Sequence, residues 1–167
     1  MPPSRFLVLD ACVLIDFCKV DKTILSVVSQ HVGKIHVPSP VLEEVDQIAE
    51  DEALDLGIVV VEPELEQAVA AGARRGGLSF EDRLCVIMAR DRSWTCVSND
   101  GAVRKACGVE SVPVLWGLEM MGLAVEAGAV GFEEAERAAW AIHHENPMYV
   151  TEEIVQRFVK KARRGWR

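Results

Sequence analysis

The chain alternates between short apolar runs rich in β-branched residues and longer stretches in which apolar residues recur every three or four positions. The short runs predict strands, and the longer stretches predict helices. Strands are expected at residues 6–10, 35–38, 58–63, 94–98 and 112–116. Strands that alternate with helices are typical of an α/β fold with a parallel sheet. We therefore expect an α/β core over about residues 5–116.

Helices are expected between these strands and after the last one. An early helix contains Ile24 and Val28. Ser39 and Pro40 predict the start of a helix that runs to about Leu56, because serine is a good N-cap and proline is tolerated in the first turn. Gly57 is a plausible end for that helix. The remaining helices are expected at residues 64–75, 79–91, 101–108, 117–128, 132–145 and 151–162.

Length and composition indicate one ordinary globular domain over residues 1–167, with a helical extension at about 117–163 packed on the core. No apolar run approaches the roughly 18 residues that cross a bilayer, and the N-terminal region is a poor signal peptide. We expect a cytoplasmic protein without a membrane segment. The five cysteines form no CxxC motif, so reduced thiols are expected rather than disulfides or structural zinc.

The net charge is −8, which argues against non-specific nucleic-acid binding by bulk charge. Charge is uneven, however, since the last eight residues, KKARRGWR, include five basic residues and one tryptophan. Two interpretations stay open for this segment: a solvated tail, or a strap that binds phosphate or a partner.

Four acidic residues occupy positions where chemistry is often found. Asp10 closes the first strand and Asp100 follows the fourth, and ligands of open parallel sheets bind beyond the carboxyl ends of the strands. Glu44 borders the apolar helix face formed by Val41, Val45 and Ile48, whereas Glu43 points to solvent. Asp82 lies in the first turn after Ser79, where a helix N-terminus stabilises negative charge. Glu44 could instead reach water, and Asp82 could be only a cap.

Clustered carboxylates repel one another, so a site built from these four acids would need divalent cations. Mg²⁺ and Mn²⁺ prefer oxygen ligands and retain bound water. One or two such ions could activate water and neutralise a scissile phosphate, their usual role in phosphodiester hydrolysis.

The four acids lie in segments that resemble the motif series of the PIN domain, a family of small metal-dependent ribonucleases that includes the VapC-type toxins. The segments are LDACVLID, VPSPVLEEV, GLSFEDRLCVIMAR and CVSNDGAVRKAC. The family has an acidic strand end, a V-x-x-E helix start, an L-S-x-x-D helix and an [ST]-x-D strand end. These motifs match Asp10, Glu44, Asp82 and Asp100, in order, over about residues 6–115.

The resemblance implies a three-layer α/β/α sandwich whose four acids bind Mg²⁺ or Mn²⁺ and catalyse the cleavage of RNA. It implies that Ser98 or Asn99 orients water or a ligand. Family members commonly form homodimers, and those that are toxins are neutralised by a small antitoxin protein. Arg83, Arg104 and Lys105 adjoin the acids and could contact phosphates, or could be plain surface charges. The extra helices, beginning LWGLEMMGLAVEAG, are similar to a less characterised PIN-like branch, which puts a toxin role in doubt.

Other functions fit the sequence less well. A haloacid-dehalogenase-type phosphatase needs a second aspartate two residues after the first, and here that position is Cys12. The acid pairs and lysine of receiver domains are not visible, and P-loop and dinucleotide fingerprints are absent. Asp16 is expected to cap or solvate the segment after the first strand. The alternative from another class is a PIN-like module that binds RNA or protein without catalysis.

Overall fold

Five strands form one sheet in the computed structural model, which describes residues 5–73 and 76–165. The strands are β1 (Arg5–Leu9), β2 (Gly33–Pro38), β3 (Val59–Val61), β4 (Thr95–Val97) and β5 (Val114–Leu115). Their order is β3-β2-β1-β4-β5, and every neighbouring pair is parallel. In the central strand, Leu7 lies opposite Ile35 of β2 and Thr95 of β4. The prediction of a parallel α/β sheet is confirmed.

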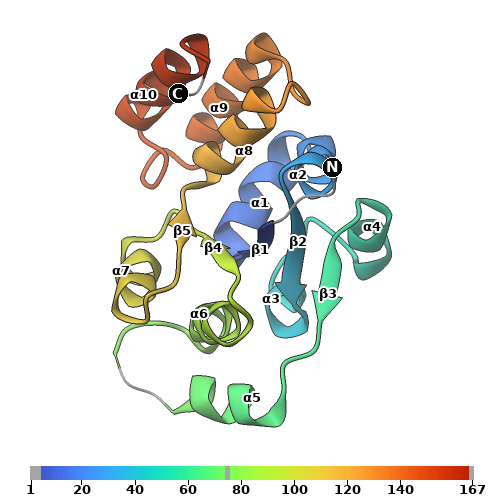
Figure 1. Ribbon diagram of the computed structural model, residues 1–167, viewed down its shortest axis with the longest axis vertical. Coiled ribbons are helices and arrows are strands. Elements are labelled where there is room, and N and C mark those ends of the chain that lie inside the picture. The colour runs from blue at the N-terminus through green and yellow to red at the C-terminus, as the bar shows by residue number, and fades with distance from the viewer. Residues whose placement is uncertain (1–4, 74–75, 166–167) are drawn as a thin grey trace.

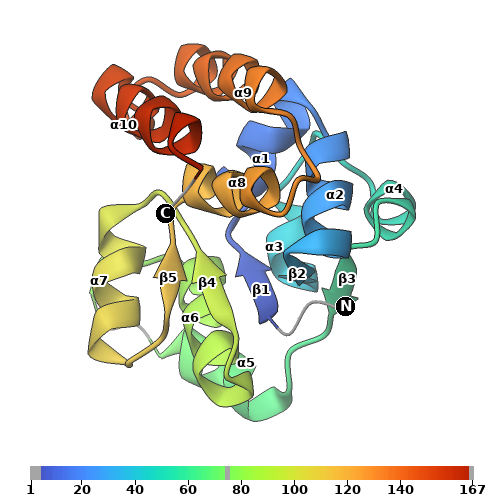
Figure 2. The same cartoon turned by 45° about the horizontal axis from the view of Figure 1, so that its top comes forward.

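Helices cover both faces of this sheet, which confirms the three-layer α/β/α arrangement (Figures 1 and 2). The helices of the core are α1 (Ala11–Val20), α2 (Thr23–His31), α3 (Ser39–Glu43), α4 (Glu50–Asp55), α5 (Leu65–Gly72), α6 (Phe80–Arg92) and α7 (Gly101–Val109). The α6 helix contacts β1, β2 and β4, and α5 packs against α6. The α2 helix contacts β2. Leu7, Val8 and Leu9 of β1 are fully buried between the layers.

Three further helices follow the last strand: α8 (Gly117–Glu126), α9 (Phe132–Glu145) and α10 (Glu152–Arg163). They contact one another, while α8 also packs on α2 and α9 on α1. Figure 1 shows them gathered at the end of the molecule opposite α5. Thr151 caps α10 by accepting a hydrogen bond from the amide of Ile154. Within residues 5–73 and 76–165, no helix is both long and apolar enough to span a membrane.

The α1 helix is an element that the sequence pattern does not predict. Its buried residues include Val13, Leu14 and Phe17, and Ile15 packs partly against the same core. Apolar residues therefore lie on nearly all sides of the helix, and the three-to-four residue period that would reveal it is lost. A short apolar run of this kind cannot be assigned by periodicity alone.

The single helix predicted from Ser39 to about Leu56 is wrong, because the structure divides it into α3 and α4. The helix also starts one residue early, so that Pro38 stands at the cap position and no side chain caps it. Between the two helices the sequence contains Val45, Asp46 and Ile48, which are poor helix formers. Val45 and Ile48 are nevertheless buried, as predicted. The glycine expected to end the segment follows α4 with a φ of +83°.

Candidate metal centre

Two of the four acids are helix N-caps at the carboxyl ends of neighbouring strands. Asp10 follows β1, and its Oδ1 accepts a hydrogen bond from the amide of Val13 at 3.0 Å. Asp100 follows β4 after two residues, and its Oδ1 accepts from the amides of Ala102 at 2.7 Å and Val103 at 3.2 Å. A parallel sheet places these strand ends on one edge, so the caps bring both carboxylates to that edge.

Asp10 is the most buried member of the group, with 1% of its surface exposed. Its second oxygen, Oδ2, is buried and has no hydrogen-bond partner among the described residues. Burial raises the pKa of Asp10 to about 6, although the nearby Ser98 hydroxyl and the Val13 amide lower it. The charges of Asp82 and Asp100 raise this pKa further. An unpaired buried carboxylate oxygen is costly, because its lost hydration is not replaced.

Asp82 lies in the first turn of α6, whose N-cap is Ser79 as predicted. The Ser79 hydroxyl accepts a hydrogen bond from the Asp82 amide at 3.1 Å. The pKa of Asp82 is raised, first by partial burial, and also by the charges of Asp100 and Glu81, while a hydrogen bond to Ser79 lowers it. Asp10, Asp82 and Asp100 therefore lie within electrostatic reach of one another.

Glu44 is exposed and stands just after α3 as its C-cap. Partial desolvation raises its pKa, as do the charge of Glu81, a hydrogen bond shared with Glu81, and the charge of Asp82. Glu44 therefore lies within electrostatic reach of the other acids through Glu81 and Asp82, both in the first turn of α6. Glu81 is a fifth acid that the sequence argument missed. The adjacent pair Glu81-Asp82 in the first turn of α6 was the signal that could have revealed it.

The acids form a loose neighbourhood rather than a tight cage. Among residues 5–73 and 76–165, no three histidine, cysteine, aspartate or glutamate side chains are arranged so that they could hold a metal ion. Two of the carboxylates are occupied as helix caps on one oxygen. The free oxygen of Asp10 and the raised pKa values of Asp10, Asp82 and Glu44 are the features that suit a cation, since a positive charge would relieve both.

Comparison of the chain with models of protein families, with curated proteins and with solved structures finds no match. The fold and the positions of the acids therefore rest on the structure of this chain, and the likeness to PIN domains rests on the sequence motifs.

Ser98 and Asn99, expected to orient water or a ligand, are both buried next to Asp100. The Ser98 hydroxyl accepts a hydrogen bond from the Asp100 amide at 3.1 Å, and Ser98 also faces Asp10. Asn99 is engaged at both ends of its amide. Its Oδ1 accepts from the Gly117 amide at 2.9 Å, and its Nδ2 donates to Asp16 at 3.4 Å. Ser98 is therefore the better placed of the two to act at the acids.

Asp16 does not cap or solvate the segment after β1, so that prediction is wrong. It lies inside α1 with 4% of its surface exposed. Its carboxylate accepts hydrogen bonds from Asn99 and, at 3.2 Å to each oxygen, from Asn146 at the end of α9. Burial raises its pKa to about 6 against these hydrogen bonds. Asp16 therefore joins the core to the C-terminal helices, through a partner 130 residues away that local sequence cannot reveal.

The three basic residues considered for phosphate contacts have different surroundings. Arg83 is buried, and its guanidinium donates to the carbonyls of Ala73 at 2.6 Å and Gly76 at 3.1 Å, which fastens the segment before α6. Arg104 donates to the Ser98 carbonyl at 3.2 Å and stacks on the ring of Trp116. Lys105 is exposed on α7. Of the three, Arg104 is the cation that contacts a residue of the candidate centre, through the Ser98 carbonyl.

Cys12 lies two residues after Asp10 and reports on the local charge. Although the residue is exposed, partial burial of its thiol and the charges of Asp10, Asp82, Asp16 and Asp100 raise its pKa to about 12. A thiol with so high a pKa remains protonated and is a poor nucleophile near neutral pH. The neighbourhood is thus strongly negative and favours oxygen-ligand chemistry over thiolate chemistry.

Proposed function

We propose that the protein is a divalent-metal-dependent ribonuclease whose centre is formed by Asp10, Glu44, Asp82 and Asp100. The observation that carries the proposal is the buried Oδ2 of Asp10, which has no hydrogen-bond partner among the described residues and lies near the charges of Asp82 and Asp100. Serine, threonine or asparagine would cap α1 and α7 as well as aspartate does, so the choice of two acids at one edge of the sheet favours a site for a cation. The order and spacing of the PIN-like motifs support the same conclusion.

Mg²⁺ or Mn²⁺ suits this donor set, because both ions prefer carboxylate oxygens and retain water. Asp10 would supply its free oxygen, and Asp82, Asp100 and Glu44 would complete the ligand set from α6, α7 and the end of α3. When bound, the cation would polarise the phosphate and lower the pKa of a bound water.

The residues of the chain have complementary tasks in this proposal. Ser98 holds the Asp100 amide and faces Asp10, so it fixes the relative positions of two acids. Arg104, whose guanidinium donates to the Ser98 carbonyl, offers the positive charge that an RNA phosphate requires next to an acidic centre. Glu81 lies close to Glu44, and its charge raises the pKa of Glu44, so it adds to the negative charge that a cation would offset.

The test is cleavage of single-stranded RNA with Mg²⁺, with Mn²⁺ and with a chelator, using the wild type and the variants Asp10→Asn, Asp82→Asn and Glu44→Gln. Each variant is expected to lose at least about 100-fold in rate, since each removes a charged ligand. Glu43→Gln is the matched control, because Glu43 is an exposed acid adjacent to Glu44.

Undiminished cleavage by Asp10→Asn would refute the four-acid centre. Metal binding without cleavage of any RNA would favour the alternative, a PIN-like binding module. The toxin role is a separate proposal: expression of the protein should arrest growth, and an antitoxin encoded beside it should relieve the arrest.

A further inference from the structure

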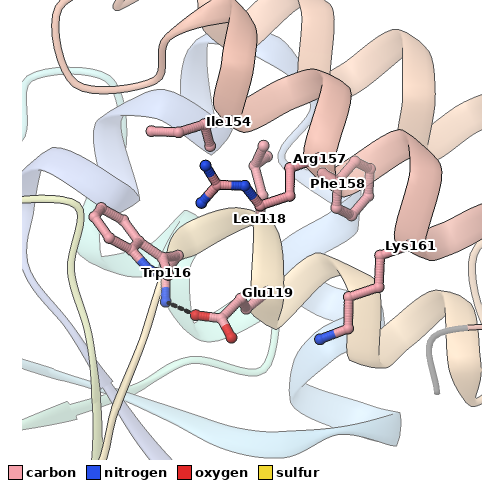
Figure 3. A pocket seen from close by; sticks show the side chains of 7 residues that line it. All are labelled: Trp116, Leu118, Glu119, Ile154, Arg157, Phe158 and Lys161. Carbon is pink, nitrogen blue, oxygen red and sulfur yellow. Dashed lines mark hydrogen bonds between the residues drawn. The ribbon is translucent and has the colours of Figure 1, made fainter.

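A pocket of about 230 Å³ lies between the start of α8 and one side of α10 (Figure 3). Trp116, Leu118 and Glu119 line it from the α8 side, and Arg157, Phe158 and Lys161 line it from α10. We call it the Trp116 pocket. Its wall is mainly aromatic and aliphatic, with two cations and one carboxylate at its rim. The volume is below that of sites for whole drug-sized ligands, about 300–1,000 Å³, so the pocket can enclose one part of a larger ligand, such as a ring, while the rest stays in solvent.

The amphipathic sequence of α10 determines where the two cations of the pocket lie. Val155, Phe158 and Ala162 are the buried residues that attach this helix to its neighbours. Arg157 and Lys161 are four residues apart, so they share one side of the helix. Figure 3 shows the Arg157 side chain extended across the pocket toward Trp116. Arg157 is exposed and forms no hydrogen bond or ion pair with the rest of the described chain.

Glu119 is the single carboxylate among the residues that line the pocket. Its Oε1 accepts a hydrogen bond from the Trp116 amide at 3.0 Å, so it is committed to the first turn of α8. Glu119 keeps its charge, but Arg157 has no ion-pair partner among the described residues, so the pocket offers a positive group although the chain as a whole carries a charge of −8. The positive charge is therefore local to this pocket and not a property of the entire surface.

Arg104 connects the pocket to the acidic centre. Its guanidinium carbon lies 3.7 Å from the centre of the Trp116 ring, and its Nη1 donates to the Ser98 carbonyl at 3.2 Å. Ser98 in turn binds the Asp100 amide. A chain of contacts therefore runs from the acidic centre through Ser98 and Arg104 to the indole of Trp116, which lines the pocket. Arg104 is the positive group between the acids and the pocket.

We propose that the Trp116 pocket binds one nucleotide of a single-stranded RNA that also occupies the acidic centre. Arg157 can bind a phosphate of such a strand, and the indole of Trp116 offers an aromatic ring against which a base can stack. An acidic peptide would use the cations but not the ring. The role as a substrate subsite rests on the proposed ribonuclease function, whereas RNA binding at the pocket does not.

Binding of a short fluorescein-labelled oligouridine RNA, followed by anisotropy with chelator present, tests the proposal. The full chain carries Asp10→Asn in every case, so that no cleavage occurs. Arg157→Ala is expected to weaken binding about 3- to 10-fold and to reduce the slope of log K against log salt by about one. Lys160→Ala is the control, since Lys160 is an exposed cation of the same helix that does not line the pocket.

Equal weakening by Arg157→Ala and Lys160→Ala would overturn the proposal in favour of bulk charge, and so would unchanged binding in Arg157→Ala. Displacement of the RNA by poly-glutamate of matched charge would also overturn it, because the ring would then contribute nothing.

Cleavage by the chain with Asp10 intact separates the two proposals. RNA binding that depends on Arg157, without cleavage in Mg²⁺ or Mn²⁺, would refute the ribonuclease function but support RNA binding at the pocket. Cleavage with a KM that Arg157→Ala does not change would support the ribonuclease function and refute the pocket as a substrate subsite.

Discussion

Asp10 is expected to make the metal-free protein less stable at neutral pH than at mildly acidic pH. Its carboxyl is 1% exposed, and its pKa is raised from 3.8 to about 6, chiefly by burial. A group whose pKa is raised in the folded state stabilises the fold below its unfolded pKa, and this stability is lost as pH rises through the folded pKa. Linkage gives a loss of about 3 kcal/mol at about pH 7.5 and about 1.6 kcal/mol at about pH 5.

Asp10→Asn removes this titration but keeps an oxygen that can cap α1 through the Val13 amide. The free energy of unfolding of the variant, relative to wild type, should therefore fall by about 1.4 kcal/mol between about pH 7.5 and about pH 5. Any fixed packing difference between the two side chains cancels in this comparison, and so does the titration of Asp16. For a chain of this size the relative midpoint of thermal unfolding should shift by about 3–6 °C.

The measurement is urea unfolding followed by tryptophan fluorescence at both pH values, with chelator present. Added Mg²⁺ should then stabilise the wild type and leave Asp10→Asn unchanged, because a ligand that binds only the folded state shifts unfolding by mass action. A stability difference that is the same at both pH values would refute the account of Asp10 as a buried, destabilised carboxylate. Glu43→Gln provides the comparison with an exposed acid outside the centre.

Three further predictions concern the rest of the molecule. Asn146→Ala should lower the free energy of unfolding by about 1–3 kcal/mol near neutral pH, because it removes a donor from the buried carboxylate of Asp16, and by less below about pH 6. Met148→Ala, at an exposed side chain, is the control and should change urea unfolding little. Gly33→Ala should destabilise by about 1–3 kcal/mol because its Cβ would lie 2.8 Å from the Arg5 carbonyl, while Gly108→Ala, with open space around it on a helix, should stabilise by about 0.5–1 kcal/mol. Cys12 should react with iodoacetamide at least about 100-fold more slowly than a free cysteine near pH 8, because its thiol stays protonated. Mg²⁺ should accelerate the reaction if it binds the acids. The rate is measured by mass spectrometry of the labelled peptide, and a rate equal to that of free cysteine would contradict the raised pKa of Cys12.

The parts of the site that the sequence predicts are those with local causes. Asp10 and Asp100 follow strands, and Ser79 with Asp82 opens a helix, so short motifs place these acids without knowledge of distant contacts. The strand positions are predictable for the same reason, since each strand is a short apolar run between turns or helix starts.

The remaining features depend on contacts between distant segments. The α1 helix is apolar on nearly all sides, because it is buried against α9 and the rest of the core, and its sequence therefore shows no helical period. The interruption between α3 and α4 reflects weak helix formers whose apolar side chains are still needed in the core. Glu81 is a member of the acid group only because α3 and α6 are in contact. The Trp116 pocket exists only because α10 packs on α8.

The hydrogen bonds from Asn146 to Asp16 have a consequence for synthesis of the chain. A ribosome delivers the core before α9, and chains generally fold from the N-terminus as they emerge. Until residue 146 has left the exit tunnel, the α1 carboxylate lacks the donor that satisfies both of its oxygens. The sheet and its acids can therefore assemble before α9 emerges, but they become fully stable only after it. If the acids cleave RNA, this order would delay full activity until residue 146 is in place.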